Sequence, residues 1–347
     1  MVVRVVSIYT LLHFLVDFAC GVLLYHQAYP FLNSFSDVFY AFLLYNFFAF
    51  AVQLPIGIIA DYINKNALFA VCGCFLVLCA YLCAPLGIIA CVIAGIGNAC
   101  FHVGGGIDVL NLSKGKATLP GIFVSSGALG IFLSAQKFLN QSYMASVFIG
   151  LMGMGCLLSY FIYRKFHTQL QNAPIESPNL SNLKLFMVVC LCLTVMLRSY
   201  TGFVLAFEWK SVFVVGLLFT MGVVLGKMFG GIVGDKFGFK KTAIISLILS
   251  VFCFCFAFQN NILGVVCGIV GVLLFNMTMP ITLTALTNLM PQQKGMAFGL
   301  LTFMLFLGSV PCLFGHKYPF FSPIGLSVLV LLSAVVLFCG LIQLEKD

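Results

Sequence analysis

A histidine and an aspartate stand four residues apart inside one long apolar stretch near the start of the chain. His13 and Asp17 therefore share a face of any helix that this stretch forms. A carboxylate beside an imidazole favours the protonated ring, so the pair is suited to relaying a proton. The alternative is a histidine that only hydrogen-bonds to a backbone carbonyl group.

A second ionisable residue, Arg198, interrupts another apolar stretch. With a rise of about 1.5 Å per residue, Asp17 and Arg198 both fall near the middle of their helices. An ionisable group at that depth costs about 2.5–3.5 kcal/mol on insertion scales, so it normally faces a cavity or a partner. We expect Asp17 and Arg198 to lie close together, either as a structural ion pair or as a pair that a solute or a proton separates.

Other polar residues inside apolar stretches complete a candidate cavity. They are Gln53, Asn98, His102, Lys227 and Asn276. A guanidinium group binds a carboxylate or phosphonate with paired donors, so Arg198 and Lys227 together favour an anionic solute. Lys227 could instead extend to the membrane surface, and the two asparagines could form interhelical hydrogen bonds.

Two histidines and an aspartate could also ligate a metal ion, although the sequence fixes no such geometry. We predict no metal and no cofactor.

Composition sets the solvent in which these residues must work. Of the 347 residues, 62% are hydrophobic and 7% are charged. A soluble domain carries about 25% charged residues, so lipid must solvate most of this chain.

The net charge of +8 is spread between apolar stretches and forms no basic stripe for nucleic acid. Most of the 15 cysteines lie in apolar stretches, where free cysteine acts as a small apolar residue.

Twelve apolar stretches approach the roughly 20 residues that a helix needs to cross a bilayer. The predicted spans are residues 5–29, 37–60, 68–84, 85–105, 119–138, 143–163, 185–206, 211–234, 242–258, 262–285, 295–315 and 323–343. Asp108 is predicted to lie in a polar loop after the fourth span. With a cytoplasmic N-terminus, twelve cationic residues lie in cytoplasmic segments and three outside, namely Lys137, Lys210 and Lys317. We therefore expect a multi-pass protein of an inner or plasma membrane with both termini in the cytoplasm.

The chain repeats short patterns at nearly constant offsets. Gly57 and Asp61 are followed 174 residues later by Gly231 and Asp235. Asn98 and Lys116 are followed 178 residues later by Asn276 and Lys294. Two parallel halves, residues 1–163 and 185–347, joined by a cytoplasmic linker, residues 164–184, explain both offsets. Parallel halves are typical of transporters that bind solute at the interface of the halves.

The stretch from Gly231 to Lys241 resembles the signature loop of the major facilitator superfamily. Its matching positions are Gly231, Asp235, Lys236, Gly238, Lys240 and Lys241. The first copy, beginning at Gly57, matches more loosely, because Tyr62 stands where a basic residue is usual and Asn64 where glycine is usual. An aspartate at a helix terminus can pair with a dipole or a cation across the interface of the halves. The resemblance implies that Asp61 and Asp235 make this contact, which locks the outward-open state.

Three other stretches resemble the fosmidomycin-resistance branch of that superfamily, which exports drugs using protons. They are HFLVD at 13–17, GNACFH at 97–102 and LRSY at 197–200. The branch usually follows its helix-four histidine with a proline and an acidic residue, whereas this chain has Val103 and Gly104. A carboxylate that could carry protons is therefore missing from that position.

Together these observations predict an all-α membrane protein of the major facilitator fold, with twelve transmembrane helices in two pseudo-symmetric six-helix bundles. We expect a monomeric secondary transporter, not an enzyme, that moves a small anionic or amphipathic solute by alternating access with proton coupling, drug or metabolite efflux being favoured. Its partners would be the solute, protons and the lipid bilayer. The alternatives are a uniporter or uptake carrier, a non-transporting membrane sensor, and a membrane enzyme that uses His13 or His102.

Overall fold

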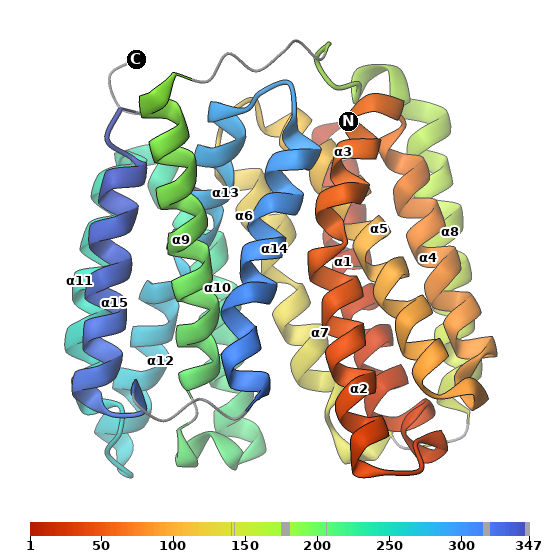
Figure 1. The fold of residues 1–347 in the computed structure, drawn as a ribbon, viewed down its shortest axis with the longest axis horizontal. Helices are drawn as coiled ribbons and strands as arrows, with labels where there is room; N and C mark the ends of the chain where they lie inside the picture. Colours follow the sequence, from red (N-terminus) through yellow and green to blue (C-terminus); the bar gives the residue numbers. More distant parts are fainter. Residues whose placement is uncertain (140, 142, 175–180, 206, 315–319, 344–347) are drawn as a thin grey trace. The chain divides into compact units, whose positions relative to one another are not determined.

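The computed structural model describes residues 1–139, 141, 143–174, 181–205, 207–314 and 320–343, and every regular element within these ranges is helical (Figure 1). Ten helical segments are long and apolar enough to cross a membrane. Two shorter apolar segments, Asn66–Leu82 and Thr118–Ser134, bring the total in the described residues to the twelve predicted. Part of the predicted linker, residues 175–180, and the predicted exterior Lys317 lie outside the described residues.

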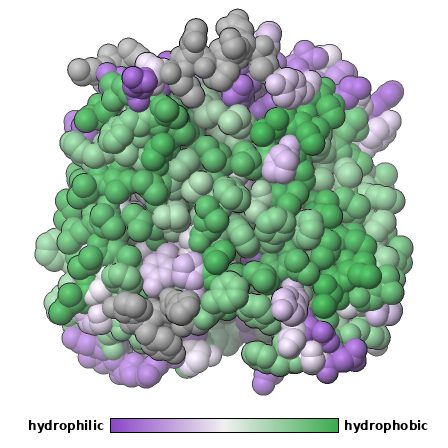
Figure 2. Space-filling view, viewed as in Figure 1, coloured by the Kyte–Doolittle hydropathy of each residue, from purple (hydrophilic) through white to green (hydrophobic). Residues whose placement is uncertain are grey.

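Much of the protein surface is apolar, as expected for a surface in contact with lipid. Figure 2 shows a face on which hydrophobic residues form a broad central band, while hydrophilic residues gather above and below this band in the view. Large apolar side chains such as Phe252, Leu157 and Val335 are more than half exposed. An exposed apolar surface of this extent is stable only in a bilayer, so the chain is an integral, multi-pass membrane protein.

The chain forms two compact units that follow its two halves, apart from two exchanged segments. Unit 1 consists of Met1–Leu112, Ser126–Ile175 and Gln292–Phe303, and unit 2 of Ser113–Ser125, Glu176–Pro291 and Met304–Asp347. Each unit therefore contains a short segment from the other half of the sequence. The division into two six-helix bundles joined by residues 164–184 stays a prediction.

Unit 1 is built mainly from the first half of the chain. Its helices are α1 (Val2–Val22), α2 (Phe35–Asn46), α3 (Gln53–Ile63), α4 (Asn66–Leu82), α5 (Ile88–Ser113), α7 (Gly127–Ser134), α8 (Met144–Phe166) and the first part of α14 (Lys294–Leu313). Helix α1 packs on α7, and α4 packs on α8. Two π-helical segments, Leu23–Gln27 and Phe47–Ala51, continue the first span and interrupt the second. Such segments often occur at functional sites.

Helix α5 corrects one boundary of the sequence analysis. The predicted span ended at residue 105 and left Asp108 in a loop, but α5 continues to Ser113. Asp108 is 1% exposed, and its neighbours Ile107 and Val109 are fully buried. A charged residue was interpreted as the end of the apolar stretch, whereas the helix continues through it and a partner on another helix binds one oxygen of the carboxyl group.

Unit 2 is built mainly from the second half. Its helices are α6 (Thr118–Ser125), α9 (Asn182–Val204), α10 (Phe213–Phe237), α11 (Phe239–Phe256), α12 (Ile262–Asn276), α13 (Thr278–Leu289), the rest of α14 and α15 (Pro323–Gly340). Helix α10 packs on α6 and α12, while α15 packs on α9 and α11.

The two signature sequences are mostly helical. Asp61 lies in α3, and Asp235 and Lys236 lie in α10. The turns that follow need only one residue with positive φ each, Asn64 at 56° and Gly238 at 93°. Asparagine tolerates the left-handed region better than most residues, which explains how Asn64 stands where glycine is usual. Lys240 and Lys241 already belong to α11.

Candidate functional site

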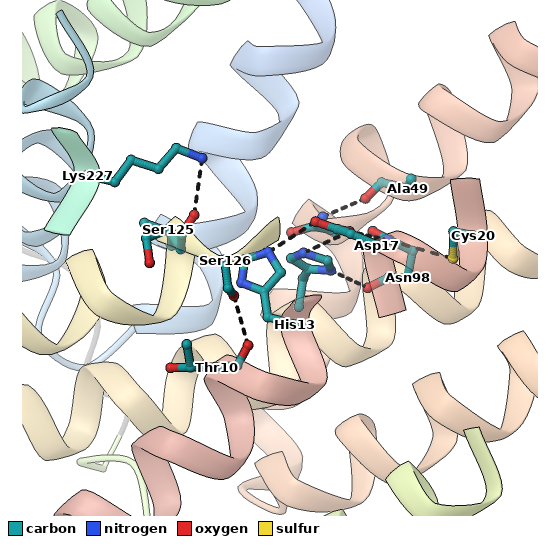
Figure 3. Close-up of polar contacts among 12 residues, drawn as sticks. Thr10, His13, Asp17, Cys20, Ala49, Asn98, Ser125, Ser126 and Lys227 are labelled. Atoms are coloured by element: carbon teal, nitrogen blue, oxygen red, sulfur yellow. Dashed lines mark hydrogen bonds and ion pairs between the residues drawn. The ribbon is translucent and has the colours of Figure 1, made fainter. Parts of the chain in front are cut away.

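Four polar side chains of unit 1 meet in the space between α1 and α5 (Figure 3). The Asp17 carboxylate lies 3.3 Å from His13 Nε2 through Oδ2 and 3.5 Å from His102 Nε2 through Oδ1. Asn98 Nδ2 donates a hydrogen bond of 2.9 Å to Asp17 Oδ1. We call these four residues the α1–α5 cluster. His13, Asp17 and Asn98 are buried, so each contact forms with little competition from water.

A backbone hydrogen bond defines how His102 presents itself to the aspartate. Its Nδ1 lies 2.9 Å from the carbonyl oxygen of Asn98, which can only accept, so Nδ1 carries a proton. In a neutral ring, Nε2 then has a lone pair that faces another acceptor, Asp17 Oδ1. A proton on either group would turn this contact into a hydrogen bond.

The same arrangement could also hold a metal ion. One ligand atom from each of His13, Asp17 and His102 lies within 4.8 Å of the others. The backbone hydrogen bond of His102 and the amide of Asn98 orient the side chains as outer-shell partners do at metal sites. The structure thus brings together the three residues whose geometry the sequence left open.

Helix α7 covers the α1–α5 cluster with backbone atoms. A Cβ atom added to Gly127 would lie 2.1 Å from Asp17 Oδ2 and 2.6 Å from His13 Nε2. Next to it, Ser126 Oγ donates a hydrogen bond of 2.8 Å to the carbonyl oxygen of Thr10 (Figure 3). Only glycine leaves room for the carboxylate at this position.

Each signature aspartate binds the N-terminus of a helix within its own unit. In unit 1, Asp61 accepts hydrogen bonds of 2.8 Å from the backbone amides of Gly295 and Met296 at the start of α14. In unit 2, Asp235 accepts from the amides of Ala117 (2.7 Å) and Thr118 (2.9 Å) at the start of α6. A carboxylate at a helix N-terminus satisfies free amides and interacts favourably with the helix dipole. We call these contacts the Asp61 latch and the Asp235 latch.

Glycines allow both latches to close. A Cβ atom on Gly57 would lie 2.1 Å from the carbonyl oxygen of Gly295, and one on Gly231 would lie 2.4 Å from that of Ala117. Gly295 and Ala117 are 178 residues apart, the offset that the sequence repeats. The two latches are therefore equivalent parts of an internal repeat, and each joins segments from opposite halves of the chain.

The cationic candidates lie in unit 2. Arg198 is in α9, is 8% exposed, and its Nη1 has no hydrogen-bond partner among the described residues. Lys227 Nζ donates a hydrogen bond of 3.1 Å to the carbonyl oxygen of Val124, near the C-terminus of α6. Because Asp17 and Arg198 belong to different units, their predicted proximity stays a prediction.

The remaining candidates make contacts within their own unit. Gln53 donates to the carbonyl oxygen of Ala49 and is 1% exposed, while its Oε1 has no partner in the described part of the chain. Asn276 donates to the carbonyl oxygen of Val272 in α12. Lys236 and Lys240 lie over the rings of Phe237 and Phe338.

Two buried polar residues of unit 1 were not predicted as site residues. Tyr9 donates a hydrogen bond of 2.7 Å to Asp108 Oδ2, and both side chains are buried. Two signals could have identified them. Tyr9 stands four residues before His13, on the same helical face, and Asp108 has apolar residues on both sides.

Comparisons with known proteins identify the fold. No protein-family model matches the chain, and a search of curated proteins finds no significant match. Among solved structures, the human organic anion transporter MFSD10 (TETRAN) is similar with a TM-score of 0.70 and 15% identity, over 96% of this chain and 99% of that one. The E. coli fucose:proton symporter FucP is similar with a TM-score of 0.61 and 13% identity, over 96% and 97%. A structure of FucP in the outward conformation also has a TM-score of 0.61, with 12% identity over 99% of both chains.

These similarities assign a class of architecture to the protein. The chain has the fold of the major facilitator superfamily transporters, as predicted, with its twelve apolar helical segments in the described residues. At such low identity the likeness concerns the fold, and the activity must be inferred from the site.

Proposed function

We propose that this protein is a proton-coupled secondary transporter that moves a small anionic or amphipathic solute by alternating access, with efflux favoured. The observation that carries the proposal is the buried carboxylate of Asp17 between two imidazole rings. An intramembrane ionisable group with such partners marks a proton or substrate pathway. We further propose a monomer in an inner or plasma membrane with both termini in the cytoplasm.

Arg198 supplies the anion preference in this proposal. A buried guanidinium group with an unpartnered nitrogen carries a large desolvation cost, which a bound carboxylate, phosphate or phosphonate would offset. Among the described residues of unit 2, no carboxylate pairs with it. The structurally similar MFSD10 is an organic anion transporter, which agrees with this substrate class.

The two latches are the conformational elements of the proposed cycle. Asp61 and Asp235 each bind two backbone amides of a helix that comes from the other half of the chain. Breaking and re-forming these contacts is the step that would let the halves rearrange around a solute. The resemblance to the signature loop of the superfamily supports this role.

The first test is ligand binding by the purified protein. Thermal unfolding is measured with inorganic phosphate, methylphosphonate, benzoate and fosmidomycin as probes. At least one anion should raise the unfolding temperature of the wild type, and Arg198→Gln should abolish that increase. Arg198→Lys should restore only part of it, because an ammonium group cannot reproduce paired guanidinium donors. Equal stabilisation of all three proteins would reject the role of Arg198.

The second test is flux of the stabilising anion into proteoliposomes, with and without a pH gradient. The wild type should accumulate the anion only with the gradient, and Asp17→Asn should lose this dependence. Gradient-independent flux would support the uniporter alternative, and absence of flux would support the sensor alternative. Wild-type transport by both Asp17→Asn and Arg198→Gln would overturn the proposed site.

A further inference from the structure

Asp108 is a buried carboxyl group of unit 1 that the proposed function does not yet use. Its Oδ2 accepts a hydrogen bond of 2.7 Å from the Tyr9 hydroxyl group. Its Oδ1 is buried and has no hydrogen-bond partner in the described part of the chain. The side-chain amide of Asn66 also interacts with the carboxyl group, while its nitrogen donates to the carbonyl oxygen of Leu170 and to Asn172 Oδ1. A carboxyl group that is 1% exposed and only half satisfied is rare in folded proteins and needs an explanation.

The surroundings of Asp108 are otherwise apolar. Tyr9 is fully buried, and its ring meets the ring of Phe101 at a centroid distance of 6.4 Å. Phe101 stands about two helical turns before Asp108 on the same face of α5. Leu110, further along α5, is 2% exposed. Water is therefore largely excluded from the carboxyl group.

Few ionisable groups face this pair. Tyr9 comes from α1, and the thiol of Cys74 on α4 lies near Tyr9. Helix α14 contributes the cation Lys294. Its Nζ donates hydrogen bonds to Asn111 Oδ1 at 2.9 Å and to the carbonyl oxygen of Leu110 at 3.4 Å. No ion pair to Asp108 forms among the described residues. A negative charge on the unpartnered Oδ1 is therefore expensive, and a proton on it removes the charge.

The position of Tyr9 links Asp108 to the α1–α5 cluster. Tyr9, His13 and Asp17 follow one another at intervals of four residues and form a stripe on one face of α1. Each interval corresponds to a rise of about 6 Å along the helix. Asp108 thus lies at one end of a polar stripe whose other end is Asp17. The hydrogen bond of Tyr9 therefore places the carboxyl group of Asp108 beside the face of α1 that carries His13 and Asp17.

We propose that Asp108 is a second proton-binding group of the transporter, which binds one proton on Oδ1 while the Tyr9 hydroxyl group holds Oδ2. Binding forms one O–H bond and neutralises the carboxylate, and release returns the proton without any other reactant. The role in transport rests on the proposed function, to which it adds a proton-binding site in the carboxyl-terminal part of α5.

Infrared difference spectroscopy of the protein in liposomes tests proton binding without any solute. Between alkaline and acidic pH, the wild type should gain a carbonyl stretching band of a protonated carboxyl group, which Asp108→Asn should lose and Asp108→Glu should keep. Tyr9→Phe should shift the band to higher frequency, because the carboxyl group loses its hydrogen-bond donor. Asp17→Asn should leave this band in place. The proposal would be overturned if the band stayed unchanged in Asp108→Asn or if the wild type showed no such band.

Transport measurements then separate proton binding from a structural role. Asp108→Asn keeps an oxygen that accepts the Tyr9 hydrogen bond but cannot bind the proton. It should unfold at the wild-type temperature yet lose accumulation driven by a pH gradient, and Asp108→Glu should regain it. Wild-type accumulation by Asp108→Asn would overturn the coupling role. If the wild type itself moves no anion, the proposed function fails, while the infrared band still decides whether Asp108 binds a proton.

Discussion

The space available to the Asp17 carboxylate is limited by one backbone position on α7. We predict that Gly127→Ala displaces the α1–α5 cluster, because the added Cβ atom would lie 2.1 Å from Asp17 Oδ2. Overpacking of this kind costs about 1–3 kcal/mol. The expected result is a lower unfolding temperature in detergent together with loss of gradient-driven transport.

A matched control for this substitution exists in the same unit. Gly150 lies in α8, and a Cβ atom added there would have no neighbour within 4 Å. Gly150→Ala should leave the unfolding temperature unchanged or raise it, because alanine favours a helix by about 1 kcal/mol over glycine. If the two alanine variants behaved alike, the crowding at Gly127 would be unimportant.

At the residue scale, spacing alone predicted part of the site. His13 and Asp17 share a face of α1 because they stand four residues apart, and this regularity is local. The approach of His102 and Asn98 to Asp17 depends on how α5 packs against α1, which no local rule contains. Asp108 was missed for a related reason, because the sequence alone does not show whether an aspartate is buried in a helix or exposed in a loop.

At the scale of single elements, the turns after α3 and α10 differ in backbone conformation although they occupy equivalent places in the repeat. Asn64 has φ 56° and ψ 40°, which asparagine tolerates, whereas Gly238 has φ 93° and ψ 144°. We predict that Asn64→Asp, which tolerates the left-handed region and keeps the oxygen that accepts the Asn172 amide at 2.7 Å, changes the unfolding temperature little. Gly238→Asn should destabilise the protein by about 1–3 kcal/mol of backbone strain. Thermal unfolding of the two variants measures both effects, and equal destabilisation would contradict the assigned conformations.

The latches can be tested one at a time by amide hydrogen exchange. Replacing Asp61 with asparagine removes a charged acceptor, and hydrogen bonds to charged groups contribute about 1.5–3 kcal/mol. We predict that Asp61→Asn speeds exchange in residues 292–303 about tenfold or more, since about 1.4 kcal/mol corresponds to a factor of ten. Asp235→Asn should act likewise on residues 113–125.

Each latch variant serves as the control for the other. Asp61 contacts the start of α14, and Asp235 contacts the start of α6, so neither substitution touches the other helix directly. Asp37→Asn adds a second control, because Asp37 accepts a backbone amide only from nearby Asn33. Faster exchange at α6 and α14 in that variant would mean that the effect is not specific to the latches.

At the scale of the whole molecule, the sequence predicted which segments cross the membrane better than where they end. In lipid, every backbone amide must be hydrogen-bonded internally, so a long apolar stretch has almost no choice but to form a helix. The ends depend on tertiary partners. Helix α5 extends past the expected limit, and Tyr9 on α1 binds one oxygen of its buried Asp108. The signature sequences are mostly helical, and their aspartates bind backbone amides of α14 and at the start of α6.

The repeat predicts that the two latches act together. In the proposed alternating-access cycle both contacts would be broken in the same state, so the state in which both latches are formed would be lost only when each latch opens. We predict that Asp61→Asn combined with Asp235→Asn increases hydrogen exchange in residues 113–125 and 292–303 by more than the sum of the single effects in free energy. Coupled sites deviate from additivity by about 0.5–3 kcal/mol, whereas independent sites add within about 0.5 kcal/mol. Strict additivity would indicate two local contacts that open separately, and the latches would then have no shared role in a transport cycle.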